Sequence, residues 1–372
     1  MVGQKRVAKM KIMAPFNTPK EIGDLIESGA TELYTGLNDE EWIRKYPIAG
    51  INRRVELKSN LNSFAELKKA VSIAHSYKTK VELTLNEHYY TQAQYPLLLE
   101  YVKKAIDTGI DALIVSDISL ILMLKEHGLV VPLSLSTGGA VFNKAAARFF
   151  GKLGIFRITI PRHVTIAEMA SIVEKIPMLE TVVFILNSRC ANIDGLCTFD
   201  HLPFKCPDPA KFLGKEVINQ YPEDVFSKDI IATGACMLPY LIEVERFNPS
   251  HNDAEDIQKQ KREAALKRQQ MWIKHHIDNI PCGACSMYDL HQMGITAVKI
   301  VGRGYVDKRK RGDIKFITML LDLLDSGIPR DEYMRVARNM YMGNYNKPCR
   351  SINCYYPEML PKEYDEATYE EE

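Results

Sequence analysis

The residues best suited to chemistry are five cysteines in one part of the chain: Cys190, Cys197, Cys236, Cys282 and Cys285. Thiolates bind soft metals, and a shell of four cysteines suits both an iron–sulfur cluster and a structural zinc ion. Eight cysteines in 372 residues are too few for a disulfide scaffold, and a chain of this length can build a large core without disulfides. The spacing therefore favours a metal site.

The other three cysteines carry weaker signals. Cys206 follows Pro203-Phe204-Lys205 in an apolar setting and is typical of a buried free thiol. Cys349 and Cys354 are separated by four residues near the end of the chain. They are either a second ligand pair or part of a packed segment, and we favour the packed segment.

The composition excludes several classes of protein. A net charge of +1 with 26% charged residues gives no overall attraction to nucleic acid or to an anionic membrane, so any polyanion must bind locally. The basic start of the chain lacks a signal-peptide cleavage site, and no apolar run approaches the roughly 20 residues that cross a bilayer. We expect a soluble, cytoplasmic protein, and in a reducing compartment clustered cysteines are more often ligands or redox groups than disulfides.

Short apolar runs alternate with amphipathic stretches through the first half of the chain, as in repeated βα units. Seven strands are expected at residues 9–15, 31–36, 80–86, 112–116, 132–136, 156–160 and 181–187. Helical spacing falls between them, at residues 19–28, 62–77, 97–108, 118–127, 143–153 and 166–176. An eighth strand is expected at residues 297–301, with a helix at 314–326. Eight such units predict a closed (β/α)8 TIM-like barrel, and the first turn lacks the glycines of a dinucleotide-binding sheet.

The pattern divides the chain into four parts. Residues 1–187 hold the first seven units, 188–296 form a cysteine-rich insertion between strands 7 and 8, 297–345 hold the last strand and helices, and 346–372 form a C-terminal segment with an acidic tail. The insertion follows a strand, so it emerges on the face where barrels of this type build active sites. Its residues 253–276 read as a long polar helix, more typical of a solvated surface than of an RNA-binding one.

Polar residues stand where the predicted strands end. They are Asn86, Thr137, Arg162, Asn187, Lys299 and Arg303. Arginine and lysine suit a carboxylate-bearing small molecule, although Lys299 and Arg303 could instead brace a loop by ion pairing. A basic run at residues 308–311 follows the last strand and is either an RNA-backbone patch or a solvated turn.

Several motifs in order resemble one known family. Cys190 and Cys197 are separated by six residues in RCANIDGLCTF, Cys236 follows in TGACMLPY, and a cysteine pair precedes GITAVKIVGR. Together with IMAPFNTPKEIGDLIESGATELYTG, LTLNEHY, LSTGGAVFN and TIPRHVTIAEM, this pattern resembles peptidase family U32, the collagenase-like proteins. The resemblance covers most of the chain.

The resemblance implies a cofactor and a role. Family members of one kind carry out oxygen-independent hydroxylation of RNA or of the ubiquinone ring, with a [4Fe-4S] cluster on four cysteines and prephenate as the oxygen source. Carried over, it implies Cys190, Cys197 and Cys236 as ligands, with Cys282 or Cys285 as the fourth; we favour Cys282. Zinc on the same sulfurs is the alternative cofactor.

The same resemblance leaves other roles open. The family's older name implies a peptidase, yet the chain has no HExxH, no GxSxG and no protease signature around a cysteine. Some members act in pairs, so a non-catalytic, cluster-carrying partner of a second family member is a further alternative. Val301 and His163 stand where the family usually has glutamate, so activity that needs those acids is not implied for this chain.

Overall fold

The computed structural model describes residues 9–46, 49–54, 57–187, 193–197, 263 and 280–361. Contacts divide the chain into two compact units, residues 1–198 with 280–372 and residues 199–279. Residues 280–296, predicted within the insertion, thus pack with the barrel strands. The predicted helix at 253–276 and Cys190, Cys206 and Cys236 lie outside the described residues, apart from Glu263.

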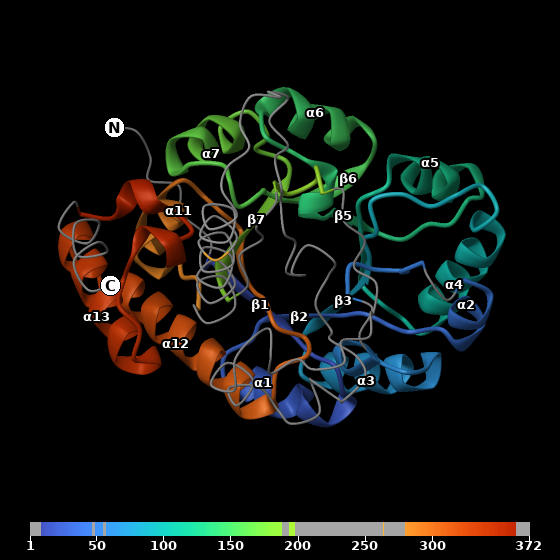
Figure 1. The fold of residues 1–372 in the computed structure, drawn as a ribbon, viewed down its shortest axis with the longest axis horizontal. Coiled ribbons are helices and arrows are strands. Elements are labelled where there is room, and N and C mark those ends of the chain that lie inside the picture. Colours follow the sequence, from blue (N-terminus) through green and yellow to red (C-terminus); the bar gives the residue numbers. More distant parts are fainter. Residues whose placement is uncertain are drawn as a thin grey trace. The chain divides into compact units, whose positions relative to one another are not determined.

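Eight parallel strands close into a barrel in chain order, which confirms the predicted (β/α)8 fold. The strands are β1 (Lys11–Pro15), β2 (Glu32–Thr35), β3 (Lys80–Leu85), β4 (Ala112–Val115), β5 (Leu133–Leu135), β6 (Ile155–Thr159), β7 (Glu180–Leu186) and β8 (Ala297–Ile300). Pairing of Met13 with Lys299 between β1 and β8 closes the ring. Figure 1 looks into this ring, with the helices outside it.

The helices outside the strands follow the predicted order. They are α1 (Ile22–Glu27), α2 (Glu40–Lys45), α3 (Phe64–Ser76), α4 (Tyr95–Asp107), α5 (Ile118–Glu126), α6 (Lys144–Lys152), α7 (Ile166–Val173), α11 (Met287–Gln292), α12 (Asp307–Asp325) and α13 (Arg330–Tyr345). Side chains of Ser63, Asn143 and Thr165 accept backbone N–H bonds at the starts of α3, α6 and α7, and so fix where these helices begin. None of the described helices is long and apolar enough to cross a membrane.

Three helices differ from the prediction, and one of them is the six-residue α11, which was not predicted. Helix α2 was not predicted, because its six residues carry one buried apolar side chain, Trp42, and depend on Asp39 as N-cap. Helix α12 begins at Asp307 rather than at residue 314, so the basic run lies inside it. The first part of this helix is polar, so apolar spacing alone does not predict it.

The basic run is used within the fold. Lys310 is buried and pairs with Glu21 at 2.8 Å, Arg311 pairs with Asp307 at 2.9 Å, and the Arg309 guanidinium stacks on the Tyr305 ring at 3.8 Å. Lys310 therefore holds α12 against its neighbour, while Arg309 and Arg311 also have partners close by. As a patch for an RNA backbone, the run offers the exposed Lys308 and two part-exposed arginines that already have partners.

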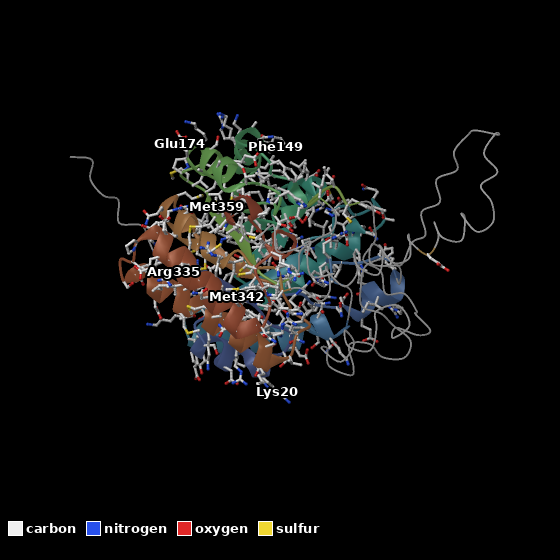
Figure 2. All side chains as sticks on the ribbon, turned by 60° about the vertical axis from the view of Figure 1, so that its left-hand side comes forward. Lys20, Phe149, Glu174, Arg335, Met342 and Met359 are labelled. Carbon is white, nitrogen blue, oxygen red and sulfur yellow. The ribbon has the colours of Figure 1, made fainter. Side chains whose placement is uncertain are left out.

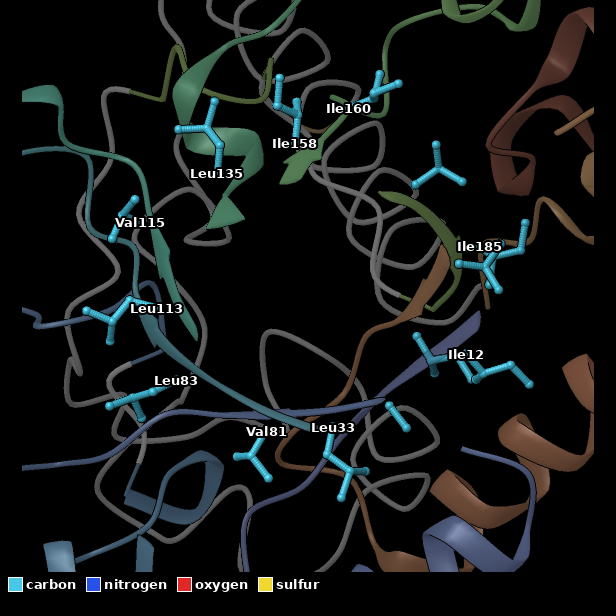
Figure 3. Packing of buried hydrophobic residues seen from close by; sticks show 14 of the residues in the cluster. Ile12, Leu33, Val81, Leu83, Leu113, Val115, Leu135, Ile158, Ile160 and Ile185 are labelled. Atoms are coloured by element: carbon cyan, nitrogen blue, oxygen red, sulfur yellow. The ribbon is translucent and has the colours of Figure 1, made fainter. Parts of the chain in front are cut away.

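Alternate residues of each strand face opposite sides of the barrel wall. Outward residues such as Ile12, Leu33 and Val81 are apolar and pack under the helices, as Figure 3 shows. Figure 2 shows the outer surface of this helical layer, with Phe149 on α6 and Glu174 just beyond α7. The interior is different: only a small apolar cluster of Met13, Tyr34 and Ile114 lies apart from the main core among the described residues.

Charged residues fill the end of the barrel where the strands begin. The Arg157 guanidinium, 2% exposed, donates to Glu32 at 2.6 and 2.9 Å, to Glu82 at 2.5 Å and to Glu180 at 2.8 Å. Lys11 adds a bond to Glu32 at 2.8 Å. This network closes the floor of the barrel, so a ligand can enter from the opposite end.

Candidate functional site at the barrel mouth

Lys299 points into the barrel from β8, above the charged floor. Its ammonium group lies 3.9 Å from the centre of the Tyr34 ring and 6.0 Å from that of Phe184, and the side chain is almost fully buried. Burial, followed by the charges of Arg303 and Arg157, lowers the pKa of Lys299 to about 7, although Glu82 acts in the opposite sense. The amine can therefore gain or lose a proton at neutral pH.

Arg303 spans the mouth from the end of β8 to the loops after β2 and to β3. Its guanidinium donates to Asn60 Oδ1 at 2.9 Å, Thr84 Oγ1 at 2.8 Å and Asn52 Oδ1 at 2.9 Å. These acceptors are neutral oxygens, so they orient the guanidinium without cancelling its charge. The predicted alternative was that Lys299 and Arg303 brace a loop by ion pairing; these three bonds of Arg303 go to neutral acceptors instead.

Asn86 and Arg53 connect this mouth to the cysteine-bearing loop. Asn86 donates to Ser136 Oγ at 3.2 Å and accepts from the Arg53 backbone at 3.3 Å, beside Thr137, which begins a 3-10 turn. The Arg53 guanidinium binds Glu87 at 2.8 Å and also contacts the Cys197 thiol. Cys197, the half-buried second cysteine of the Cys-x6-Cys pair, therefore lies at the barrel mouth.

The Arg162 guanidinium forms an ion pair with Asp194. Asp194 lies three residues before Cys197. Its Nε and terminal nitrogen donate to the carboxylate at 3.0 and 2.6 Å, and its backbone N–H donates at 2.9 Å. Burial alone would raise the pKa of Asp194, but Arg162 holds this pKa below its ordinary value. Gly195 follows at φ +83°, where an added Cβ would stand 2.6 Å from Ala140, so the loop packs tightly on the turn after β5.

Asn187 does not face the mouth. It is fully buried with φ +69°, and its amide donates to Asp313 at 2.8 Å and to the Val301 carbonyl at 3.0 Å. The Tyr355 hydroxyl donates to its carbonyl. The structure thus gives Asn187 a role in joining β7, α12 and the C-terminal segment.

The other described cysteines lie elsewhere in the barrel unit. Cys282 and Cys285 line a cavity together with Cys349 and Cys354, and Cys197 is not among the residues that line it. Burial raises the pKa of the Cys282 thiol well above its ordinary value and that of Cys349 to about 11. Among the described residues, no group of three or more His, Cys, Asp or Glu side chains stands arranged to hold a metal ion.

Three residues were missed by reasoning from the sequence, two at the mouth and one, Glu82, at the floor below Lys299. Asp194 lies inside the Cys-x6-Cys segment and could have been found there as the one acid between the two cysteines. Arg53 lies in a loop without a regular pattern, and Glu82 sits in the middle of a strand, where its inward direction depends on the register. Neither gave a signal in the sequence.

The pKa of Lys299 near 7 predicts pH-dependent binding of an anion at the mouth. Below this pKa the charged amine attracts a carboxylate, and above it the attraction is lost. Affinity for the anion should therefore decrease as the pH rises through about 7, with a slope that approaches about tenfold per pH unit. Binding of prephenate, followed by calorimetry from mildly acidic to mildly basic pH, measures this. Lys299→Met should bind weakly at every pH, whereas Lys308→Met, which removes an exposed lysine, should behave as the wild type. Equal slopes in all three proteins would contradict the assignment.

A family model covers most of the chain. The sequence model described as Peptidase family U32 matches residues 17–347, which include strands β2 to β8 and begin just after β1. Among solved structures, the U32 peptidase Mk0906 is 13% identical with a TM-score of 0.41, over 81% of this chain and 95% of that one.

Curated relatives align over about half of the chain. The tRNA hydroxylation protein P of Escherichia coli (strain K12) is 25% identical over 191 residues, which are 51% of this chain and 39% of the relative. The protein of the same name from Helicobacter pylori (strain ATCC 700392 / 26695) is 25% identical over 197 residues, 52% of this chain and 43% of the relative. The tRNA hydroxylation protein P1 of Bacillus subtilis (strain 168) is 23% identical over 205 residues, 54% and 44% respectively. The match thus spans less than half the length of these relatives.

Proposed function

The chain belongs to peptidase family U32, and from this premise we propose that it takes part in the oxygen-independent hydroxylation of a base in transfer RNA. The curated relatives aligned with it are named tRNA hydroxylation proteins. The proposal includes an iron–sulfur cluster and an anionic co-substrate of the prephenate type. The single observation that carries the proposal is that Cys197 lies at a barrel mouth lined by positively charged side chains.

The charges at the mouth suit a small anion. Lys299, Arg303, Arg53 and Arg162 contribute positive charge, and the carboxylates described near them are Glu87, Asp194 and, toward the floor, Glu82. A dicarboxylate entering the mouth would meet the Lys299 ammonium and the oriented Arg303 guanidinium between the Tyr34 and Phe184 rings. Low local dielectric strengthens both contacts, because the rings and the charged floor exclude water.

The cluster is proposed on cysteines of the loop after β7. Cys197 fits such a ligand, because it is half-buried, belongs to a loop anchored by Asp194, and lies beside the Arg53 cation. Cys190 and Cys236 lie outside the described residues. Cys282 lines a cavity with Cys285, Cys349 and Cys354, and Cys197 is not among the residues that line it. An iron–sulfur cluster, when bound, supplies the one-electron chemistry that side chains lack.

The test is a nucleoside profile of transfer RNA. A strain that lacks the gene should lose one hydroxylated nucleoside in mass spectrometry, and the wild-type gene should restore it. The Lys299→Met gene should fail to restore it, while Lys308→Met should succeed. An unchanged nucleoside profile in the deletion strain would rule out the proposal.

Two alternatives predicted from the resemblance receive no support from the described residues. A peptidase needs a nucleophile with a base or a metal-bound water, and nothing observed at the mouth favours such a pair over anion binding. A non-catalytic partner of a second family member would be identified by co-purification with that protein. In that case the nucleoside would be lost when either gene is deleted.

A further inference from the structure

Four of the eight cysteines gather around one cavity outside the barrel wall. Cys282 and Cys285 come from the segment before α11, and Cys349 and Cys354 come from the segment after α13. The cavity has a volume of about 20 Å³ and is lined on its other side by Ala337, Arg338 and Tyr341 of α13. Figure 1 shows α11 and α13 as neighbours outside the strands.

The first pair sits on a tight turn fastened to the barrel. The Gly283 N–H donates to the Ile185 carbonyl of β7 at 2.8 Å, and the Ala284 N–H donates to the Cys282 sulfur at 3.3 Å. Gly283 is required here, because an added Cβ would stand 2.7 Å from the Tyr356 ring. An N–H aimed at a cysteine sulfur stabilises the thiolate form that binds metals.

The second pair is held against the first by backbone hydrogen bonds. The Cys282 N–H donates to the Asn353 carbonyl at 2.9 Å, and the Tyr355 N–H donates to the Cys282 carbonyl at 3.0 Å. The buried Asn353 side chain closes the turn, since it accepts from the Arg350 N–H and donates to the Pro348 carbonyl, both at 2.9 Å. Segments more than sixty positions apart in the sequence are thus fixed so that their cysteines line the same cavity.

We propose that Cys282, Cys285, Cys349 and Cys354 form a second metal site, distinct from the iron–sulfur site, that holds a zinc ion. The spacings Cys-x2-Cys and Cys-x4-Cys are those of structural zinc sites. The cavity admits about one water-sized group, which suits a single ion and leaves no room for an eight-atom cluster. Arg338 lies beside Cys285 and Cys349 and would offset the negative charge of four thiolates around Zn²⁺.

Binding requires a small rearrangement of the sulfurs. They line the cavity but do not converge as an ion needs. A change of the χ1 rotamer moves a cysteine sulfur by about 3 Å, so the side chains can turn inward while the backbone bonds stay in place. The zinc would then join the end of β7, the segment before α11 and the C-terminal segment.

The proposal also divides the cysteines of the chain into two sets of four. If Cys282 and Cys285 serve the zinc site, the cysteines that remain are Cys190, Cys197, Cys206 and Cys236. Four is the number that one [4Fe-4S] cluster requires. The zinc site therefore replaces Cys282 by Cys206 as the fourth cluster ligand.

The test is the metal content of the full-length protein, purified without oxygen. The wild type should hold about one zinc per chain, and the Cys349→Ser/Cys354→Ser variant should lose it while keeping its iron and sulfide. Cys190→Ser/Cys197→Ser should do the reverse, so failure of the iron–sulfur proposal and failure of the zinc proposal are read from different proteins. Circular dichroism monitors the folding of each variant.

A second measurement keeps the test independent of folding. Wild-type protein stripped of zinc with a chelator should take up Co²⁺ and show the intense visible absorption of tetrahedral cobalt thiolates. A wild type that holds no zinc and binds no Co²⁺ would refute the site. Iron and sulfide lost from the Cys349→Ser/Cys354→Ser variant, with zinc unaffected, would overturn the zinc assignment and make the site a cluster.

Discussion

Replacing Arg157 by methionine is expected to lower the free energy of unfolding by about 3–5 kcal/mol, as removal of one partner from a buried ion pair does elsewhere. The guanidinium is 2% exposed and bonds Glu32, Glu82 and Glu180 at once. Without this guanidinium, the carboxylates of Glu32 and Glu82 would stay buried, and Glu32 would keep only its ion pair with Lys11. Burial already raises the pKa of Glu82, and loss of Arg157, which opposes that rise, would raise it further.

Chemical denaturation at neutral pH measures this change, with Arg335→Met as the matched control. Arg335 is an exposed arginine of α13, labelled in Figure 2, whose ion pair with Glu332 spans 3.8 Å. Exposed pairs contribute about 0–1 kcal/mol, so the control should stay close to the wild type. Similar losses in both variants would mean that the floor of the barrel does not depend on this network.

The barrel could be predicted from the sequence because each strand and helix carries its own local pattern. Apolar runs such as those of β4 and β7 alternate with amphipathic helices, and this order determines the fold class. The charged floor could not be predicted in the same way. Arg157 and Glu32 are 125 positions apart in the sequence. Their side chains face each other inside the barrel only because of the register between the strands.

The residues of the candidate site that stand at the ends of strands could be predicted from the sequence. Lys299 and Arg303 were placed at the mouth, since the residues at the ends of barrel strands face it. Their partners come from loops that are far away in the sequence. Asn187 also stands at the end of a strand, but its left-handed backbone directs the side-chain amide away from the mouth, toward Asp313. The meeting of Cys282 with Cys354 depends on a backbone pairing that no spacing rule predicts.

If the proposed cluster is bound, replacing Arg162 by methionine is expected to weaken iron binding by about 10- to 100-fold, the range found when residues that orient a metal ligand are removed. Arg162 was predicted to hold the co-substrate, but its guanidinium is paired with Asp194 in the loop that ends at Cys197. Removing the guanidinium leaves the Asp194 carboxylate, 5% exposed, without its partner in a site of low dielectric. The loop must then open to hydrate the carboxylate, and Cys197 moves with it.

Asp194→Asn tests the same link from the other side, because the amide keeps the size of the side chain but loses its charge. It should lose less iron than Arg162→Met, since the amide oxygen can still accept a bond from Arg162, and the unpaired guanidinium is more exposed, at 13%, than the unpaired carboxylate, at 4%. His163 is relevant here: it lies near Asp194 and lowers its pKa, whereas the glutamate usual in the family would repel it.

The matched control is Arg330→Met, which breaks a pair of nearly the same geometry. Arg330 binds Asp289 through two bonds of 2.8 Å each, but the pair is partly exposed and far from Cys197 in the sequence. Water can replace the lost arginine there, so iron content should equal that of the wild type. Iron and sulfide analysis of the three variants therefore separates positioning of the Cys197 loop from the general effect of losing an arginine. Full iron content in Arg162→Met would show that the loop holds Cys197 in place without this ion pair.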